Sequence, residues 1–120
     1  MVFEDLAQQV QVADLRRLQK EVEEWTAHNF PERLAYRPLL GMGEELGELN
    51  HAHLKSEQNI RGTQAEHRAA KIDALADLFI YAADYANMER IDLTDAINQT
   101  WDKVKARDWQ TNPKNGGNGD

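Results

Sequence analysis

The chain has 120 residues, no cysteine and a formal net charge of −7. This length suits one domain with a small hydrophobic core, and the lack of cysteine excludes disulfides, thiolate catalysis and Cys-ligated zinc. The acidic balance argues against nucleic-acid polymers and anionic membranes as partners, because both attract a basic surface. No apolar run approaches the roughly 20 residues that span a bilayer, and the acidic N-terminus does not resemble a signal peptide. We therefore expect a cytoplasmic protein that does not bind membranes.

Apolar residues recur at helical spacing along most of the chain, and no segment alternates with the period of a strand. A first helix is expected over about residues 4–27, because Pro31 disfavours helix in the residue before it. A second helix is expected to start near Pro38, and its apolar stripe continues to His53. The polar residues 56–64 are predicted to form a loop.

A third helix is expected over residues 66–88, which include the most apolar part of the chain. A helix that is apolar nearly all round is expected to be buried. A fourth helix has a clear start, since Asp92 can cap it and Asp95 follows three residues later. This helix is expected to end near Trp109.

The predicted fold class is therefore all-α. Four helices with short connections indicate a four-helix bundle over residues 1–110. Because the core of so short a chain is small, we expect it to be completed by oligomerisation. Residues 111–120 are rich in Gly and Asn and are expected to be a disordered tail.

Acidic residues of the second helix lie near its apolar stripe. On a helical wheel Glu45 is about 40° from the edge of that stripe, and Glu48 is its neighbour on the helix surface, three residues further on. Both carboxylates can lie at the margin of the core. By this geometry alone, an ordinary solvated face is an equally good interpretation.

The third helix carries a narrow acidic stripe in apolar surroundings. Asp73, Asp77 and Asp84 fall within about 40° of one another on the wheel, and no Lys or Arg occurs between Lys71 and Arg90. Like charges so placed repel one another, and partial burial makes their ionisation costlier. A bound cation would relieve both effects. Oxygen ligands without cysteine select Mg²⁺, Mn²⁺ or Ca²⁺ over zinc.

If these two helices pack antiparallel, four carboxylates can converge across a cleft, namely those of Glu45, Glu48, Asp73 and Asp77. They would hold one or more divalent ions, and Mg²⁺ in particular leaves positions for water and substrate phosphates. Such ions can neutralise a triphosphate and orient an attacking water. Glu44 is adjacent to these ligands and could accept a proton from that water.

The run EELGEL at residues 44–49, followed about one helix later by ADLFIY, resembles the MazG-like family. These proteins are all-α nucleoside triphosphate pyrophosphohydrolases, related in fold to the dimeric dUTPases. The resemblance extends over about residues 25–109. It implies a Mg²⁺-dependent enzyme, with Mn²⁺ as a substitute. The enzyme would hydrolyse an NTP or dNTP between the α- and β-phosphates to a nucleoside monophosphate and pyrophosphate. It also implies a homodimer or a homotetramer.

The resemblance also implies roles for individual residues. Metal ligands are expected at Glu45, Glu48 and Asp77, and Glu44 is the candidate base. The family's second motif is Glu-x-x-Asp, and its Glu falls on Ala74, which cannot bind a metal. Asp73 is four residues before Asp77 and points the same way around the helix, so we take Asp73 as the substitute ligand.

Candidate substrate-binding residues lie outside these motifs. Lys103 and Arg107 are placed near the end of the last helix, where cations also suit the helix dipole. The family often carries basic residues there, which favours contact with substrate phosphates. Lys55 could reach a phosphate as well, although a solvated lysine is the simpler interpretation. Trp25 and Asn29 are candidates for lining a base pocket, although tryptophan is more often a core or interface residue.

Two other functions are open. Glu48-x-x-His51 is a motif of di-iron carboxylate proteins, but it occurs once, so a complete site would need two subunits. The alternative without catalysis is a helical interaction or regulatory module that has kept the fold and lost the chemistry. The alanine at position 74 supports that alternative.

Overall fold

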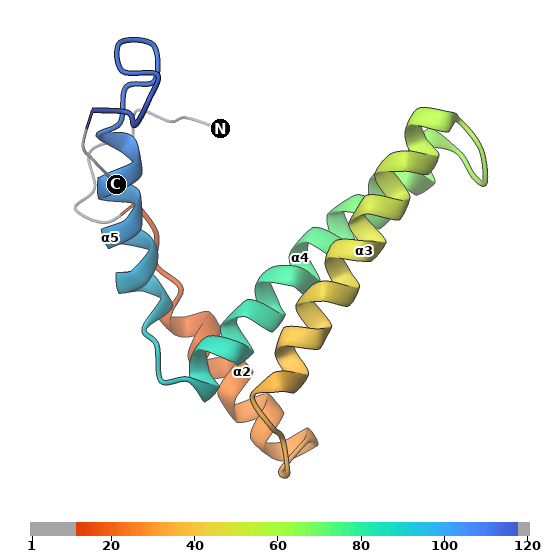
Figure 1. The fold of residues 1–120 in the computed structure, drawn as a ribbon. Helices are drawn as coiled ribbons and strands as arrows, with labels where there is room; N and C mark the ends of the chain where they lie inside the picture. Colours follow the sequence, from red (N-terminus) through yellow and green to blue (C-terminus); the bar gives the residue numbers. More distant parts are fainter. Residues whose placement is uncertain (1–11, 118–120) are drawn as a thin grey trace. The chain divides into compact units, whose positions relative to one another are not determined.

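The computed structural model describes residues 12–117 and, within them, four α-helices and no strand (Figure 1). The helices are α2 (Arg16–Asn29), α3 (Tyr36–Gln58), α4 (Gln64–Met88) and α5 (Leu93–Lys105). The all-α prediction is therefore confirmed over this range. None of these described helices has the length and apolarity needed to cross a membrane.

The chain divides into two compact units. One comprises residues 18–91 and holds α3, α4 and most of α2. The other comprises residues 1–17 and 92–120, and its described part includes α5.

In the first unit, α3 and α4 run side by side and form a helical hairpin (Figure 1). The helix α3 ends at Gln58, and the next residue, Asn59, has a left-handed φ of 56°, a conformation that commonly terminates helices. Thr63 then caps α4 by accepting the backbone N–H of Glu66 at 3.1 Å. The loop is held from inside by His67, whose Nε2 lies 2.8 Å from the carbonyl oxygen of Ile60. The predicted loop at residues 56–64 is thus shorter than expected.

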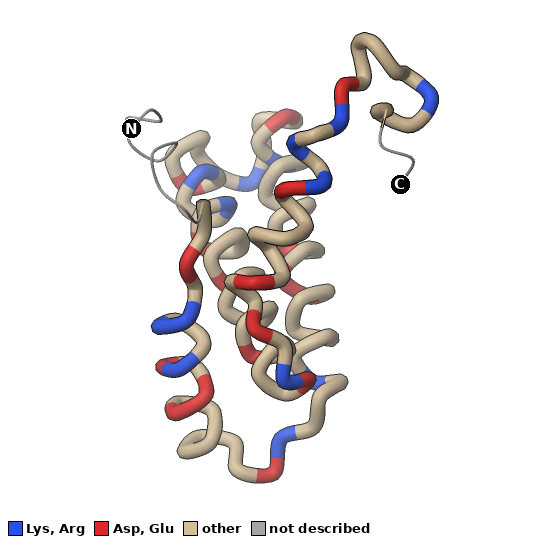
Figure 2. Tube along the Cα trace, turned by 90° about the vertical axis from the view of Figure 1, so that its left-hand side faces the viewer, with Lys and Arg blue, Asp and Glu red and all other residues tan. Residues whose placement is uncertain are grey.

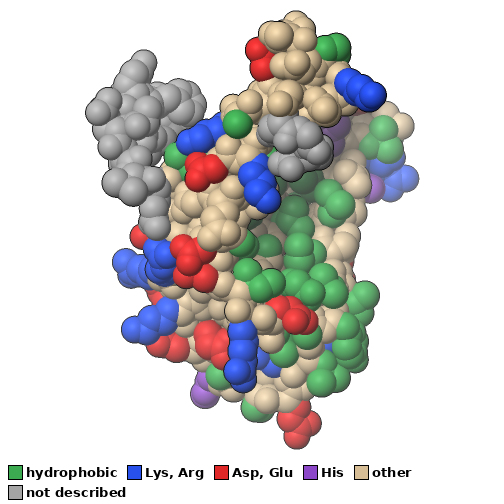
Figure 3. All heavy atoms as spheres, turned by 60° about the vertical axis from the view of Figure 1, so that its left-hand side comes forward, with side chains coloured by type: hydrophobic (Ala, Val, Ile, Leu, Met, Phe, Trp, Pro, Cys, Tyr) green, Lys and Arg blue, Asp and Glu red, His purple; other side chains and the backbone are tan. Residues whose placement is uncertain are grey.

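The buried positions of this unit are mostly small, whereas several large apolar side chains remain exposed. Ala74 and Ala83 are 2% and 0% exposed, but Ile72 and Phe79 are 57% and 52% exposed. Figure 3 shows hydrophobic side chains gathered over one face of the molecule. The expectation that this helix is buried all round is therefore wrong for these positions. The physical reason is that α3 covers one side of α4, and α2 contacts it only near its end.

That contact between α2 and the end of α4 is polar. The Gln19 side-chain amide donates to Asn87 Oδ1 at 3.0 Å and to the carbonyl of Ile91 at 2.9 Å. The Asn87 amide donates in return to the Gln19 carbonyl at 2.8 Å. Gln19 is buried, so these bonds satisfy a polar group that would otherwise be costly to bury. They fix the position of α2 across the hairpin.

The helix α2 starts at Arg16, in the second unit. The prediction of a continuous helix over residues 4–27 is therefore wrong. Residues 12–15 are not helical, and the part before residue 12 lies outside the described residues. Side chains of α5 bind the backbone here. Asn98 Oδ1 accepts the N–H groups of Val12 and Ala13 at 3.1 and 3.2 Å, and Thr94 Oγ1 accepts that of Leu15 at 2.7 Å. These N–H groups are thereby satisfied without a helix.

The last helix begins as predicted and ends early. Asp92 Oδ1 accepts the N–H of Asp95 at 3.2 Å, and this bond lowers the pKa of the Asp92 carboxyl. The helix ends at Lys105 rather than near Trp109. The described tail, up to residue 117, forms turns, in which the Asp108 N–H donates to the Gly116 carbonyl at 2.8 Å.

Candidate functional site

Three glutamates on α3 form a carboxylate cluster. Glu44, Glu45 and Glu48 each offer one carboxylate oxygen, and these oxygens lie within 4.8 Å of one another. Three negative charges at this spacing repel one another unless a cation lies among them. The facing helix adds no basic residue between Lys71 and Arg90, and acidic positions are marked along the trace in Figure 2. The cluster is therefore suited to a divalent cation with oxygen ligands.

Glu45 is the buried member of the cluster. Glu45 is 7% exposed, and its Oε2 has no hydrogen-bond partner among the residues that the structure describes. Burial raises the pKa of Glu45, and the adjacent Glu48 raises it further through a hydrogen bond and its charge. The charges of Asp77 and Glu44 act in the same direction. A buried carboxylate oxygen without a donor is costly. It is also a suitable ligand for Mg²⁺ or Mn²⁺.

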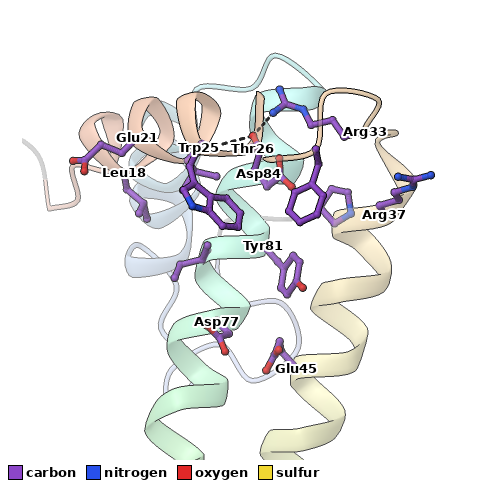
Figure 4. Close-up of a pocket in the computed structure, with 14 residues that line it drawn as sticks. Leu18, Glu21, Trp25, Thr26, Arg33, Arg37, Glu45, Asp77, Tyr81 and Asp84 are labelled. Atoms are coloured by element: carbon purple, nitrogen blue, oxygen red, sulfur yellow. Dashed lines mark hydrogen bonds between the residues drawn. The ribbon is translucent and has the colours of Figure 1, made fainter. Parts of the chain in front are cut away.

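Asp77 faces this cluster from α4. It lines the same cavity as Glu45, and Figure 4 shows the two carboxylates on neighbouring turns of α4 and α3. The Asp77 carboxylate does not belong to the group of oxygens within 4.8 Å, although its charge acts on Glu45. The structure thus brings Glu44, Glu45 and Glu48 together, with Asp77 opposite them.

Asp73 is exposed and lines a second cavity, which it shares with two members of the cluster, Glu44 and Glu48, and with Lys55. Its carboxylate does not join the cluster. The neighbouring Ala74 is 2% exposed, so a longer acidic side chain there would have to enter the packed interior. The role of Asp73 as a substitute metal ligand therefore stays a prediction.

A cavity of about 840 Å³ extends from Glu45 and Asp77 toward α2. Figure 4 shows its opposite end, where Trp25, Thr26 and Asp84 lie, with Tyr81 between the two ends. Trp25 is 58% exposed and packs edge to face against Phe30, with ring centroids 5.7 Å apart. The size and the mixture of apolar walls with a few polar groups are typical of a small-molecule site.

The candidate base-pocket residues therefore separate. Trp25 lines the cavity, but Asn29 does not. The Asn29 amide instead donates to the carbonyl oxygen of Trp25 at 2.9 Å, one helical turn before it. Asn29 is the last residue of α2, so its side chain satisfies a carbonyl at the helix end.

Tyr81 is a site residue that the sequence interpretation missed. Burial raises the pKa of its hydroxyl, and the surrounding carboxylates, first those of Glu44 and Glu45, raise it further. Its ring occupies the space beside Gly41 of α3, where an added Cβ would come within 2.4 Å of the ring. A glycine inside a helix is unfavourable by itself. Gly41 was therefore the available signal that something packs closely at that turn.

Arg33 and Asp84 form the polar end of the cavity. The Arg33 guanidinium donates to Glu23 Oε1 at 2.6 Å and to the Thr26 hydroxyl. Asp84 Oδ1 is buried and has no hydrogen-bond partner in the described part of the chain. Burial raises the pKa of Asp84, Arg33 opposes this rise, and Glu23 adds to it. The sequence placed Asp84 in the acidic stripe but assigned it no role, and nothing local pointed to Arg33.

The candidate phosphate-binding residues are spread over both units. Lys55 lines the second cavity, and its Nζ donates to Gln58 Oε1 at 3.0 Å. Lys103 is in the last turn of α5, and Arg107 follows the end of that helix. An added Cβ at Gly116 would lie 2.6 Å from Arg107 Cβ, so the tail packs closely on this arginine. Phosphate contact by these residues stays a prediction.

In comparisons with protein-family models, with curated proteins and with solved structures, the chain matches none of them. The resemblance to the MazG-like family therefore rests on the residues of the two acidic motifs themselves.

Proposed function

We propose that this protein is a Mg²⁺-dependent nucleoside triphosphate pyrophosphohydrolase of the MazG-like kind. It would hydrolyse an NTP or dNTP between the α- and β-phosphates and release a nucleoside monophosphate and pyrophosphate. The observation that carries the proposal is the buried, unpartnered Oε2 of Glu45 within the cluster of Glu44, Glu45 and Glu48. That cluster adjoins a cavity large enough for a nucleotide.

The donor set fits the proposed metal. Glu45 and Glu48 are assigned as ligands, with Asp77 facing them from α4, and carboxylate oxygens are the ligands that Mg²⁺ and Mn²⁺ prefer. When bound, the ion would neutralise charge on the triphosphate and stabilise the charge that develops during hydrolysis. Without it, the acidic cluster would repel the substrate.

Glu44 is assigned as the general base. It is exposed, adjoins the two ligands and lines the second cavity, so a water molecule can reach it. The oxygen of that water bonds to one phosphorus of the α–β anhydride, and its proton passes to the Glu44 carboxylate. The bond from that phosphorus to the bridging oxygen breaks, and the bridging oxygen keeps the electron pair. The products are a monophosphate and pyrophosphate.

The wall of the larger cavity is assigned to the nucleoside. Trp25 presents an exposed aromatic face on which a base can stack, and stacking on aromatic side chains tolerates any base. Tyr81 lies between this wall and the carboxylates (Figure 4). The order along the cavity therefore matches the order of base, sugar and phosphates in a nucleotide.

The test is pyrophosphate release from a panel of NTPs and dNTPs with Mg²⁺, with Mn²⁺ and with EDTA. The same panel is run on Glu48→Gln and Asp73→Asn. We expect metal-dependent release that falls at least a hundredfold in Glu48→Gln. Loss in Asp73→Asn as well would support the substitute ligand, and full activity there would reject that assignment alone. Absence of turnover with every nucleotide and metal would reject the proposed function in favour of a non-catalytic module.

A further inference from the structure

Asp84 is a half-buried acid that the proposed hydrolysis does not use. It lies on the same face of α4 as Asp77, seven residues further along, which is two helical turns or about 10 Å. Asp77 lies at the carboxylate end of the cavity, and Asp84 lies at the end near Trp25 (Figure 4). If the phosphates of a nucleotide bind beside Asp77, the base reaches the end of the cavity where the Asp84 carboxylate lies.

The described neighbours of Asp84 do not supply a hydrogen-bond donor to its Oδ1. Its Oδ1 is buried and without a partner among the described residues. The charge of Arg33 acts on Asp84, but the Arg33 guanidinium donates its hydrogen bonds to Glu23 and Thr26. Buried polar atoms are nearly always paired in proteins. A donor on a bound ligand would satisfy this oxygen.

An ionised carboxylate can only accept hydrogen bonds, and its two oxygens suit two parallel N–H donors. Among the common bases only guanine has such an edge, formed by its ring N1–H and its 2-amino group. Adenine and cytosine place an acceptor nitrogen beside their amino group, and that lone pair would face the carboxylate. Uracil and thymine have one N–H between two carbonyl oxygens. Carboxylate chemistry therefore discriminates among the bases.

We infer that Asp84 determines base specificity, and that its carboxylate accepts the N1–H and 2-amino groups of a guanine-type base held against Trp25. This inference rests on the proposed function, because the hydrolysis reaction supplies the nucleotide. It narrows the substrate class to guanine nucleotides and to modified purines that keep the same two donors. Burial raises the pKa of Asp84, and carboxyl groups with a raised pKa in a cavity are common at ligand-binding sites.

The test compares GTP with ITP, whose base lacks only the 2-amino group. We measure kcat/KM for pyrophosphate release from both, in the wild type and in Asp84→Asn. A hydrogen bond to a charged acceptor predicts a preference for GTP of about 10- to 100-fold in the wild type. The preference should fall to about one in Asp84→Asn, because an amide cannot accept both donors. Glu89→Gln, an exposed position just after α4, is the control and should keep the preference.

Binding of the products GMP and IMP is measured in parallel by calorimetry, so that the inference is tested without turnover. Tighter binding of GMP that is lost in Asp84→Asn supports it even if no nucleotide is hydrolysed, in which case only the proposed function fails. Equal kcat/KM values for GTP and ITP in the wild type, together with equal affinities for GMP and IMP, would overturn the inference. A preference for guanine over hypoxanthine that persists in Asp84→Asn would overturn it as well. Failure of GMP and IMP to bind at all would reject the base site.

Discussion

The carboxylate cluster is expected to lower the stability of the folded protein without a cation and to raise it when a cation is bound. Replacing Glu45 by Gln tests both effects. Without a cation, Glu45 is an acid whose pKa is raised in the folded protein, so the folded state binds more protons than the unfolded state between the ordinary and the raised pKa. Stability therefore falls as the pH rises through that window, and at neutral pH the full cost is present. Glu45→Gln removes this cost. In EDTA at pH 7 the variant should melt at the same temperature as the wild type or higher.

A divalent cation should reverse this order. At a free Mg²⁺ concentration of one hundred times its Kd, a site present only in the folded state contributes about 2.7 kcal/mol. For a chain of 120 residues this corresponds to a rise in Tm of roughly 10 °C, from the average unfolding entropy per residue. Glu45→Gln loses a ligand, and its Tm should rise by less than roughly 3 °C at the same concentration.

The assay is thermal unfolding followed by circular dichroism, in EDTA and over a titration of Mg²⁺ and Mn²⁺. Glu57→Gln is the matched control, because Glu57 is an exposed residue of the same helix whose carboxylate lies 3.0 Å from His53 Nε2. It should respond to Mg²⁺ as the wild type does. An equal response of Glu45→Gln and the wild type would refute the assignment of Glu45 as a ligand. A variant that is less stable than the wild type in EDTA would refute the account of its burial.

Four further results are expected. Thr63→Ala removes the cap of α4 and should lower the free energy of unfolding by about 1 kcal/mol, measured by urea denaturation; an unchanged midpoint would contradict the capping role. Gly41→Ala places a Cβ within 2.4 Å of the Tyr81 ring, so pyrophosphate release should fall at least tenfold, and full activity would show that the ring is not needed there. Asp84→Asn should raise the Tm at pH 7. Burial raises the pKa of Asp84, so its ionised form destabilises the folded state; the charge of Arg33 lowers this pKa and that of Glu23 raises it. The gain should shrink as the pH falls below the raised pKa, and a gain that is constant with pH would contradict this reasoning. Light scattering coupled to size exclusion should give the mass of two or four chains, since large apolar side chains of α3 and α4 are exposed; a monomer at micromolar concentration would reject the expected oligomer.

Local signals in the sequence were sufficient for much of the fold. The cap at Asp92 and the first-turn proline at Pro38 place the starts of α5 and α3 to within about two residues, because both act on adjacent backbone groups. The start of α2 could not be read in this way. Asn98 and Thr94 bind the backbone before Arg16 from a distant part of the chain. Such long-range hydrogen bonds have no local pattern.

The same distinction holds for the site. Glu45 and Glu48 are neighbours by their spacing on one helix, so their proximity followed from the sequence. Asp73 and Asp77 share a direction on the helical wheel, but four residues advance a helix by about 6 Å, and the two aspartates line different cavities. A helical wheel shows the direction in which a side chain points around the helix, but it does not show the distance between residues along the helix axis. Tyr81 comes to the site through tertiary packing, which the spacing of one segment does not contain.

The most direct test of the proposed reaction is ³¹P NMR of a nucleotide mixture incubated with the wild-type protein and Mg²⁺. The account predicts that pyrophosphate and nucleoside monophosphate appear in equal amounts as the triphosphate signals decay, and that EDTA stops the reaction. Formation of orthophosphate and nucleoside diphosphate, or spectra that do not change with time, would contradict it.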